Sequence, residues 1–135
     1  MTTGELLRQL VQMLLMAAPI ACISWTVTHE EVFREPREFC KRLSENAGNV
    51  FVKKFFYLFT CEYCFSHWIT MGVLAVTGFR LIYDDWRGVI GAFFSLVWIA
   101  NVYMSLFGRV RLEIKHERNE AVIAEAKARK INHRA

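Results

Sequence analysis

The chain alternates between three long apolar runs and short stretches that hold most of its charged residues. The runs are Leu10–Val27, Phe55–Phe79 and Val89–Phe107. In a soluble amphipathic helix, polar residues would return every three or four positions, whereas here the charges cluster between the runs. This segregation is typical of membrane proteins. It predicts an all-α, polytopic membrane protein with three transmembrane helices.

The first and third runs are the most regular of the three. Leu10–Val27 has 18 residues without a formal charge, and Val89–Phe107 has 19 with Asn101 as its strongly polar member. A spanning helix needs about 20 apolar residues, so both runs fit. Because one basic residue precedes the first run, a cleaved signal peptide is the alternative there. We expect an uncleaved helix that Pro19 kinks.

The second run contains polar residues near its start. After the cysteines, the apolar core Phe65–Phe79 has 15 residues, which is short for a span. With Phe55–Thr60 included it becomes long. We therefore expect the second helix to start before Cys61 or to bend there.

Two further helices are predicted outside the spans. Pro36 suits a first helical turn, and Phe39, Cys40 and Leu43 follow at helical spacing, which predicts a short amphipathic interfacial helix. A plain surface helix packed on the bundle is the alternative. The C-terminal stretch alternates acidic with basic residues and predicts a charged helix, with a solvated tail as the alternative. The expected domains are a three-span membrane domain, 1–108, and a basic cytoplasmic tail, 109–135.

Lysine and arginine positions predict the orientation. The first loop contains six of them and the tail eight, whereas the N-terminus has one and the second loop two. Positive flanks stay in the cytoplasm, so the first loop and the tail are expected there and the N-terminus outside. We attribute the net charge of +4 to these flanks and expect no nucleic-acid partner.

Candidate chemistry gathers at the start of the second run. Cys61, Cys64 and His67 form a C-x2-C-x2-H pattern, to which Cys40 could add a fourth zinc ligand. In one continuous helix, however, Cys61 and His67 would lie about 9 Å apart along the axis. A redox pair at a helix N-terminus is a second possibility. We favour a third, in which the cysteines are small buried packing residues.

Small residues four positions apart predict close helix packing. The pairs include Ala17/Ala21, Gly88/Ala92 and Gly91/Ser95. Such pairs let helix backbones approach, within a bundle or between copies, and Asn101 fits as a packing hydrogen-bond donor. The chain has no phosphate-binding glycine loop, Ser/His/Asp arrangement or H-E-x-x-H motif. We expect no catalytic role, no cofactor and no small-molecule substrate.

Two motifs resemble a known family. The segment FREPRE (33–38) and the block CEYCFSHW (61–68) are similar to the F-x-P-x-R segment and C-P-x-C-x-S-x-W block of small bacterial and phage membrane proteins of unknown function. The resemblance covers roughly residues 20–107 and implies three spans but no activity. Glu62 replaces the usual proline of the block. His67 stands where an apolar aromatic is usual, so a family-wide metal site would depend on the cysteines.

These observations predict a non-catalytic subunit or self-associating scaffold of a membrane complex. Its expected partners are the lipid bilayer and further copies of itself or other membrane subunits. Its expected location is the bacterial cytoplasmic membrane, whether the host or a phage encodes it. One alternative is an oligomeric pore of the holin or defence type, with Asn101 facing its lumen. The other is a metal or redox protein that uses Cys61 and Cys64.

Overall fold

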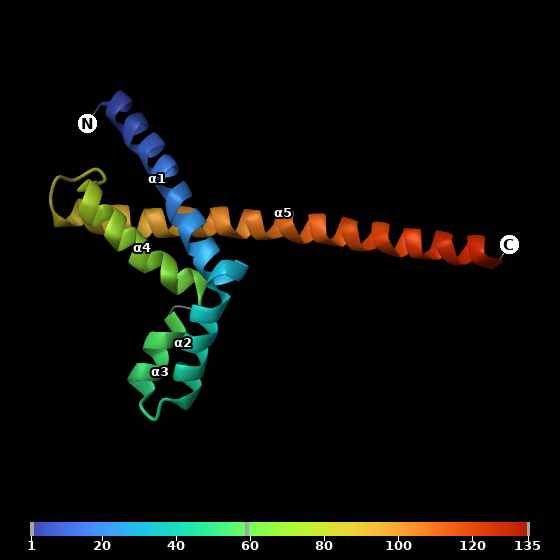
Figure 1. Ribbon diagram of the computed structural model, residues 1–135. Coiled ribbons are helices and arrows are strands. Elements are labelled where there is room, and N and C mark those ends of the chain that lie inside the picture. The colour runs from blue at the N-terminus through green and yellow to red at the C-terminus, as the bar shows by residue number, and fades with distance from the viewer. Residues whose placement is uncertain (1, 59, 135) are drawn as a thin grey trace. The chain divides into compact units, whose positions relative to one another are not determined.

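The computed structural model describes residues 2–58 and 60–134, and every regular element in this part is helical (Figure 1). The prediction of an all-α chain is therefore confirmed. By their internal contacts the residues divide into two compact units, Met1–Met104 and Ser105–Ala135. The elements are α1 (Thr3–His29), the 3-10 helix η1 (Glu31–Phe33), α2 (Arg34–Asn46), α3 (Val50–Leu58), α4 (Glu62–Thr77) and α5 (Trp86–Arg134).

Two of these helices are long and apolar enough, by length and composition, to cross a membrane. They are Thr3–His29 and Trp86–His133. The first begins with a capping box, in which Thr2 and Glu5 each accept a hydrogen bond from the other's backbone N–H. Pro19 lies within this helix. The first and third predicted spans thus correspond to long apolar helices.

The second apolar run is divided between α3 and α4. Cys61 is the N-cap of α4 and has an extended backbone (φ −102°, ψ 117°), which corresponds to the second of the two expected alternatives, a bend at Cys61. Helix α4 has 16 residues and ends at Thr77, and its C-cap Gly78 has a φ of 62°. At 1.5 Å per residue it is about 24 Å long, less than the roughly 30 Å of a bilayer core. The three-span arrangement therefore stays a prediction.

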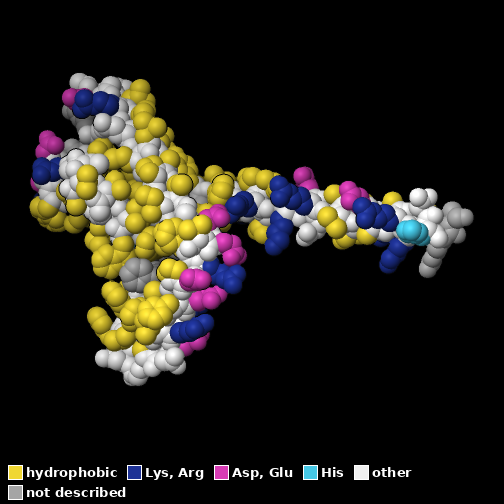
Figure 2. All heavy atoms as spheres, viewed as in Figure 1, with side chains coloured by type: hydrophobic (Ala, Val, Ile, Leu, Met, Phe, Trp, Pro, Cys, Tyr) yellow, Lys and Arg dark blue, Asp and Glu magenta, His cyan; other side chains and the backbone are white. Residues whose placement is uncertain are grey.

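The core of the first unit is made largely of small and medium side chains from α1, α4 and α5. Its buried members are Met13, Ala17, Ile20, Ala21, Leu74, Ala92, Leu96, Ala100 and Met104. Many of the largest apolar side chains lie outside instead, as the yellow surface in Figure 2 shows; Val76 is 89% exposed and Trp98 70% exposed. Small residues inside and large apolar residues outside are expected of helices packed within lipid.

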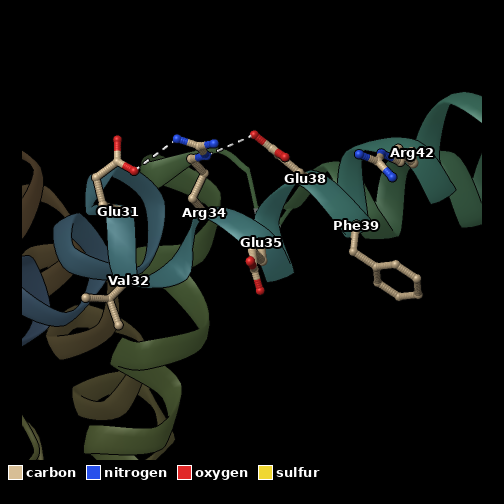
Figure 3. Close-up of a pocket in the computed structure, with 7 residues that line it drawn as sticks. All are labelled: Glu31, Val32, Arg34, Glu35, Glu38, Phe39 and Arg42. Carbon is tan, nitrogen blue, oxygen red and sulfur yellow. Dashed lines mark hydrogen bonds and ion pairs between the residues drawn. The ribbon is translucent and has the colours of Figure 1, made fainter.

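Helices α2 and α3 lie side by side as an antiparallel hairpin (Figure 1). The Ser44 hydroxyl donates to the Lys53 carbonyl at 2.9 Å and joins them. The predicted short helix around Pro36 is confirmed, with Pro36 in its first turn. Figure 3 shows Arg34 between Glu31 and Glu38, with N···O distances of 3.2 and 3.4 Å.

The link between α4 and α5 contains a strained turn. Ile82 has a φ of 68°, which is rare for a β-branched residue. The Tyr83 N–H donates to the Leu81 carbonyl at 2.7 Å, closing a γ-turn around Ile82, and the Ile82 N–H donates to Gln9 Oε1 at 3.2 Å. Gly88 is required here, because a Cβ at this position would overlap the Tyr83 carbonyl oxygen.

The second unit is one helical segment, the C-terminal part of α5. The predicted charged helix is therefore present, and its described side chains are exposed almost throughout. His116 and Glu120 form an i,i+4 pair at 3.4 Å, and the Arg111 guanidinium lies 5.4 Å from the centroid of the Phe107 ring.

Candidate functional site at the start of helix α4

The cysteine pair lies at the N-terminus of α4. Cys61 occupies the N-cap position, Cys64 lies in the first turn, and both are half-buried free thiols. Cys40 lies on α2 and is also half-buried. Within residues 2–58 and 60–134, no three His, Cys, Asp or Glu side chains are close enough to share a metal ion. The structure thus does not assemble Cys61, Cys64, Cys40 and His67 as one ligand set.

His67 is held on α4 itself. Its Nδ1 lies 2.7 Å from the Tyr63 carbonyl oxygen, one turn earlier. Its ring contacts the Tyr63 ring edge-on at 4.8 Å and the Phe93 ring of α5 at 5.7 Å, centroid to centroid. His67 therefore takes part in aromatic packing between α4 and α5.

A polar contact joins α4 to α5 at Ser66, the residue next to His67. Ser66 is completely buried, and its hydroxyl accepts a hydrogen bond from the Asn101 amide at 3.2 Å. The same amide donates to the Val97 carbonyl at 2.7 Å, and the Ser66 hydroxyl donates to the Tyr63 carbonyl at 2.7 Å. The amide group of Asn101 is thus used within the bundle, as expected of a packing residue.

A second polar contact joins the end of α1 to the start of α4. His29 Nε2 lies 3.4 Å from Glu62 Oε2, and the two side chains are 41% and 39% exposed. Trp25 stacks on the His29 ring at 3.9 Å with the rings 5° apart, and the Thr28 hydroxyl lies 2.9 Å from His29 Nδ1. The Glu62 Oε2 atom is buried without a hydrogen bond among the described residues, so the ion pair compensates its burial while His29 is protonated.

The positions of His29 and Glu62 in the sequence could have indicated this pair. In the predicted topology His29 ends the first span and Glu62 opens the second on the same side of the membrane. An acid at the foot of an apolar helix needs a partner. Glu62 is also the residue that departs from the proline of the resembled family. Together, His29, Glu62, Ser66 and Asn101 form a polar junction that ties α1 and α5 to α4.

The predicted packing residues divide into two groups. Ala17, Ala21 and Ala92 are buried in the core. Gly91 and Ser95 are only half-buried, and a Cβ added to Gly91 would meet nothing within 4 Å. The first group therefore packs the bundle, whereas the second leaves space on α5.

An open apolar groove of about 560 Å³ runs between α4 and α5. It has almost no polar surface, and a lipid chain or an apolar helix would match it. It is lined by Met71, Leu74, Ala75, Val89, Ile90, Phe93 and Phe94.

The fold and the junction define an all-helical chain with two helices that could cross a membrane. Comparison with protein-family models, with curated proteins and with solved structures finds no match. The resemblance in residues 33–38 and 61–68 consequently stays a prediction.

Proposed function

We propose that this chain is a non-catalytic integral membrane protein that self-associates or serves as a subunit of a membrane complex. Two properties support a structural role. The polar side chains of the junction bond to each other or to the backbone, and the large apolar side chains face outward. We place α1, α4 and the apolar part of α5 in the bilayer, with the N-terminus outside and the tail in the cytoplasm.

The main support for self-association is a repeat of apolar residues in the second unit. From Phe107 onward, seven of the eight positions spaced alternately three and four residues apart are apolar. Such a 3.5-residue repeat lets two helices pack along a common seam. Glu117 is the exception, and the alanines make the seam narrow in the middle. The seam consists of Phe107, Val110, Ile114, Glu117, Ala121, Ala124, Ala128 and Ile131.

Charges beside the seam both attract and repel in a parallel pair of copies. Two copies inserted with the same orientation would present parallel tails. In that arrangement Glu113 of one copy meets Arg118 of the other, which attracts, whereas Glu120 meets Glu125, which repels. The charges thus contribute little net free energy to the association of two tails. Confinement to one membrane would favour association by raising the effective concentration of the copies.

The test measures association of the full chain in vesicles by energy transfer between donor- and acceptor-labelled copies. Ile114→Asp places a charge on the seam and should lower the association constant about tenfold, or about 1.4 kcal/mol. Leu112→Asp is the matched control. Leu112 is more exposed (68% against 46%) but lies off the seam, so association should stay near that of the parent chain.

Two results would contradict the proposal. One is a parent chain that remains monomeric at every protein-to-lipid ratio and captures no partner from native membranes. The other is equal association by both aspartate variants, which would remove the seam from the explanation. Dye leakage from the same vesicles would support the pore alternative, and stoichiometric zinc in the purified protein would support the metal alternative.

A further inference from the structure

Helix α3 exposes its apolar side chains to an unusual degree. No residue of its nine is buried. Phe51 is 81% exposed, and Phe55, one turn later, is also exposed. In Figure 2 hydrophobic side chains gather on the α3 side of the α2–α3 hairpin, whereas charged side chains gather on the α2 side. A patch of this kind on a short helix marks an interaction surface.

The charges on α3 are all of one sign. Lys53 and Lys54 are the only charged residues in the segment 47–61, and neither has an ion-pair partner among the described residues. Arg34 on α2, by contrast, is paired with two carboxylates. Helix α3 therefore presents uncompensated cations beside exposed aromatic rings.

We propose that α3 is an interfacial helix that binds anionic phospholipid headgroups. Lys54 lies next to Phe55 in sequence and one turn after Phe51, so a protein partner that covered the rings would also bury this ammonium group. A lipid surface accepts both, because the rings enter the acyl boundary while the lysine stem extends to the phosphates. Juxtamembrane lysines are attracted to anionic lipids in this way.

The position of α3 in the chain supports a lipid surface over a second copy. Helix α3 ends at Leu58 and α4 begins at Glu62. If α4 enters the bilayer, α3 must lie at the boundary where it enters. This inference rests on the membrane insertion proposed above and assigns lipid recognition to a segment that the sequence had placed partly in the second span.

The experiment places an environment-sensitive fluorophore on single cysteines of the full chain, after Cys22, Cys40, Cys61 and Cys64 are replaced by serine. The labelled sites are Phe51→Cys on α3, Glu45→Cys on the charged α2 face, and Phe94→Cys as a control within the apolar part of α5. For the labels at 51 and 45 the vesicles contain a quencher at headgroup depth, and for the label at 94 they contain one at the middle of the acyl chains. They consist of phosphatidylcholine alone or with phosphatidylglycerol.

The label at 51 should be quenched about twofold more in the anionic vesicles than in the neutral ones. The double substitution Lys53→Gln and Lys54→Gln should remove this difference. The label at 45 should show neither effect. Quenching at 94 without quenching at 51 would overturn the inference and leave membrane insertion intact, whereas no quenching at 94 would overturn both. Quenching at 51 that is independent of lipid charge would also overturn the inference. So would protection of the label at 51 from the quencher that increases with protein concentration.

A second measurement avoids the cysteine substitutions. Amine-reactive labelling of the native chain, read by mass spectrometry, should modify Lys53 and Lys54 less in anionic vesicles than in neutral ones. Lys115, an exposed tail lysine, provides an internal reference within each sample. Equal modification of the α3 lysines relative to Lys115 in both vesicle types would contradict anionic-lipid binding.

Discussion

The two units of the molecule use apolar residues in opposite ways. In Met1–Met104, small residues such as Ala17 and Ala92 are buried while large apolar side chains lie outside. In Ser105–Ala135 charges alternate along the helix, and seven of the eight positions of one 3.5-residue repeat are apolar. The first arrangement suits lipid, in which close backbone approach stabilises helix pairs; the second suits water, in which a narrow apolar seam does so. The proposed membrane insertion would thus place the two units in different solvents.

The largest expected effect comes from enlarging the core of the first unit. Ala17 is completely buried, so Ala17→Leu should separate the helices and destabilise the fold by about 1–3 kcal/mol. Ala18, the next residue on α1, is exposed, and Ala18→Leu should leave stability unchanged. Unfolding with a denaturing detergent, followed by circular dichroism, measures the difference. Equal stability of the two variants would show that burial of small residues does not hold this unit together.

A gain in stability is expected from the strained link. The left-handed region costs L-residues about 1–2 kcal/mol, so Ile82→Gly, at φ 68°, should stabilise the fold by about 1 kcal/mol after the entropy of glycine is subtracted. Ile90→Gly, in the interior of α5, should instead destabilise it by roughly 1 kcal/mol. The same unfolding assay applies. A loss of stability in Ile82→Gly would mean that the isoleucine side chain contributes more than its backbone costs.

The polar junction should contribute less than the core. Asn101→Ala removes the hydrogen bond from α5 to Ser66, and such bonds in membranes average about 0.6 kcal/mol. Asn119→Ala, on the exposed tail helix, is the control and should have no effect. A loss above about 2 kcal/mol would exceed the range for a packing bond and would point to a larger network around Asn101.

Much of the fold followed from periodicity, because long apolar runs and alternating charges have few alternatives to helix. A bend at Cys61 was one of two expected alternatives, the other being a second helix that starts before Cys61, because the core after the cysteines was short for a span and the run from Phe55 was long. Periodicity could not predict that α3 is a separate helix. Its sequence continues the apolar run of α4, and only the extended backbone at Cys61 divides them.

The candidate site was predicted only in part. Helical spacing alone predicted that Cys61 and His67 would be too far apart along the axis to bind one metal ion. In the structure the His67 ring contacts the Tyr63 carbonyl oxygen instead. The contact between His29 and Glu62 joins residues 33 positions apart, so no local pattern could specify its geometry. Positive φ at Ile82 was likewise invisible, because isoleucine gives no signal for a left-handed turn.

The smallest expected effect tests the charge pattern of the tail. In parallel copies Glu120 faces Glu125, so Glu125→Lys should replace repulsion with attraction and strengthen association by about 0.5 kcal/mol. In antiparallel copies the same lysine would face Arg118 and weaken association. Glu120→Lys together with Glu125→Lys restores a like-charge pair and should return the parallel association to the parent value. Energy transfer in vesicles at low salt, where screening is least, distinguishes the two arrangements, and a weaker association of Glu125→Lys would reject the parallel seam.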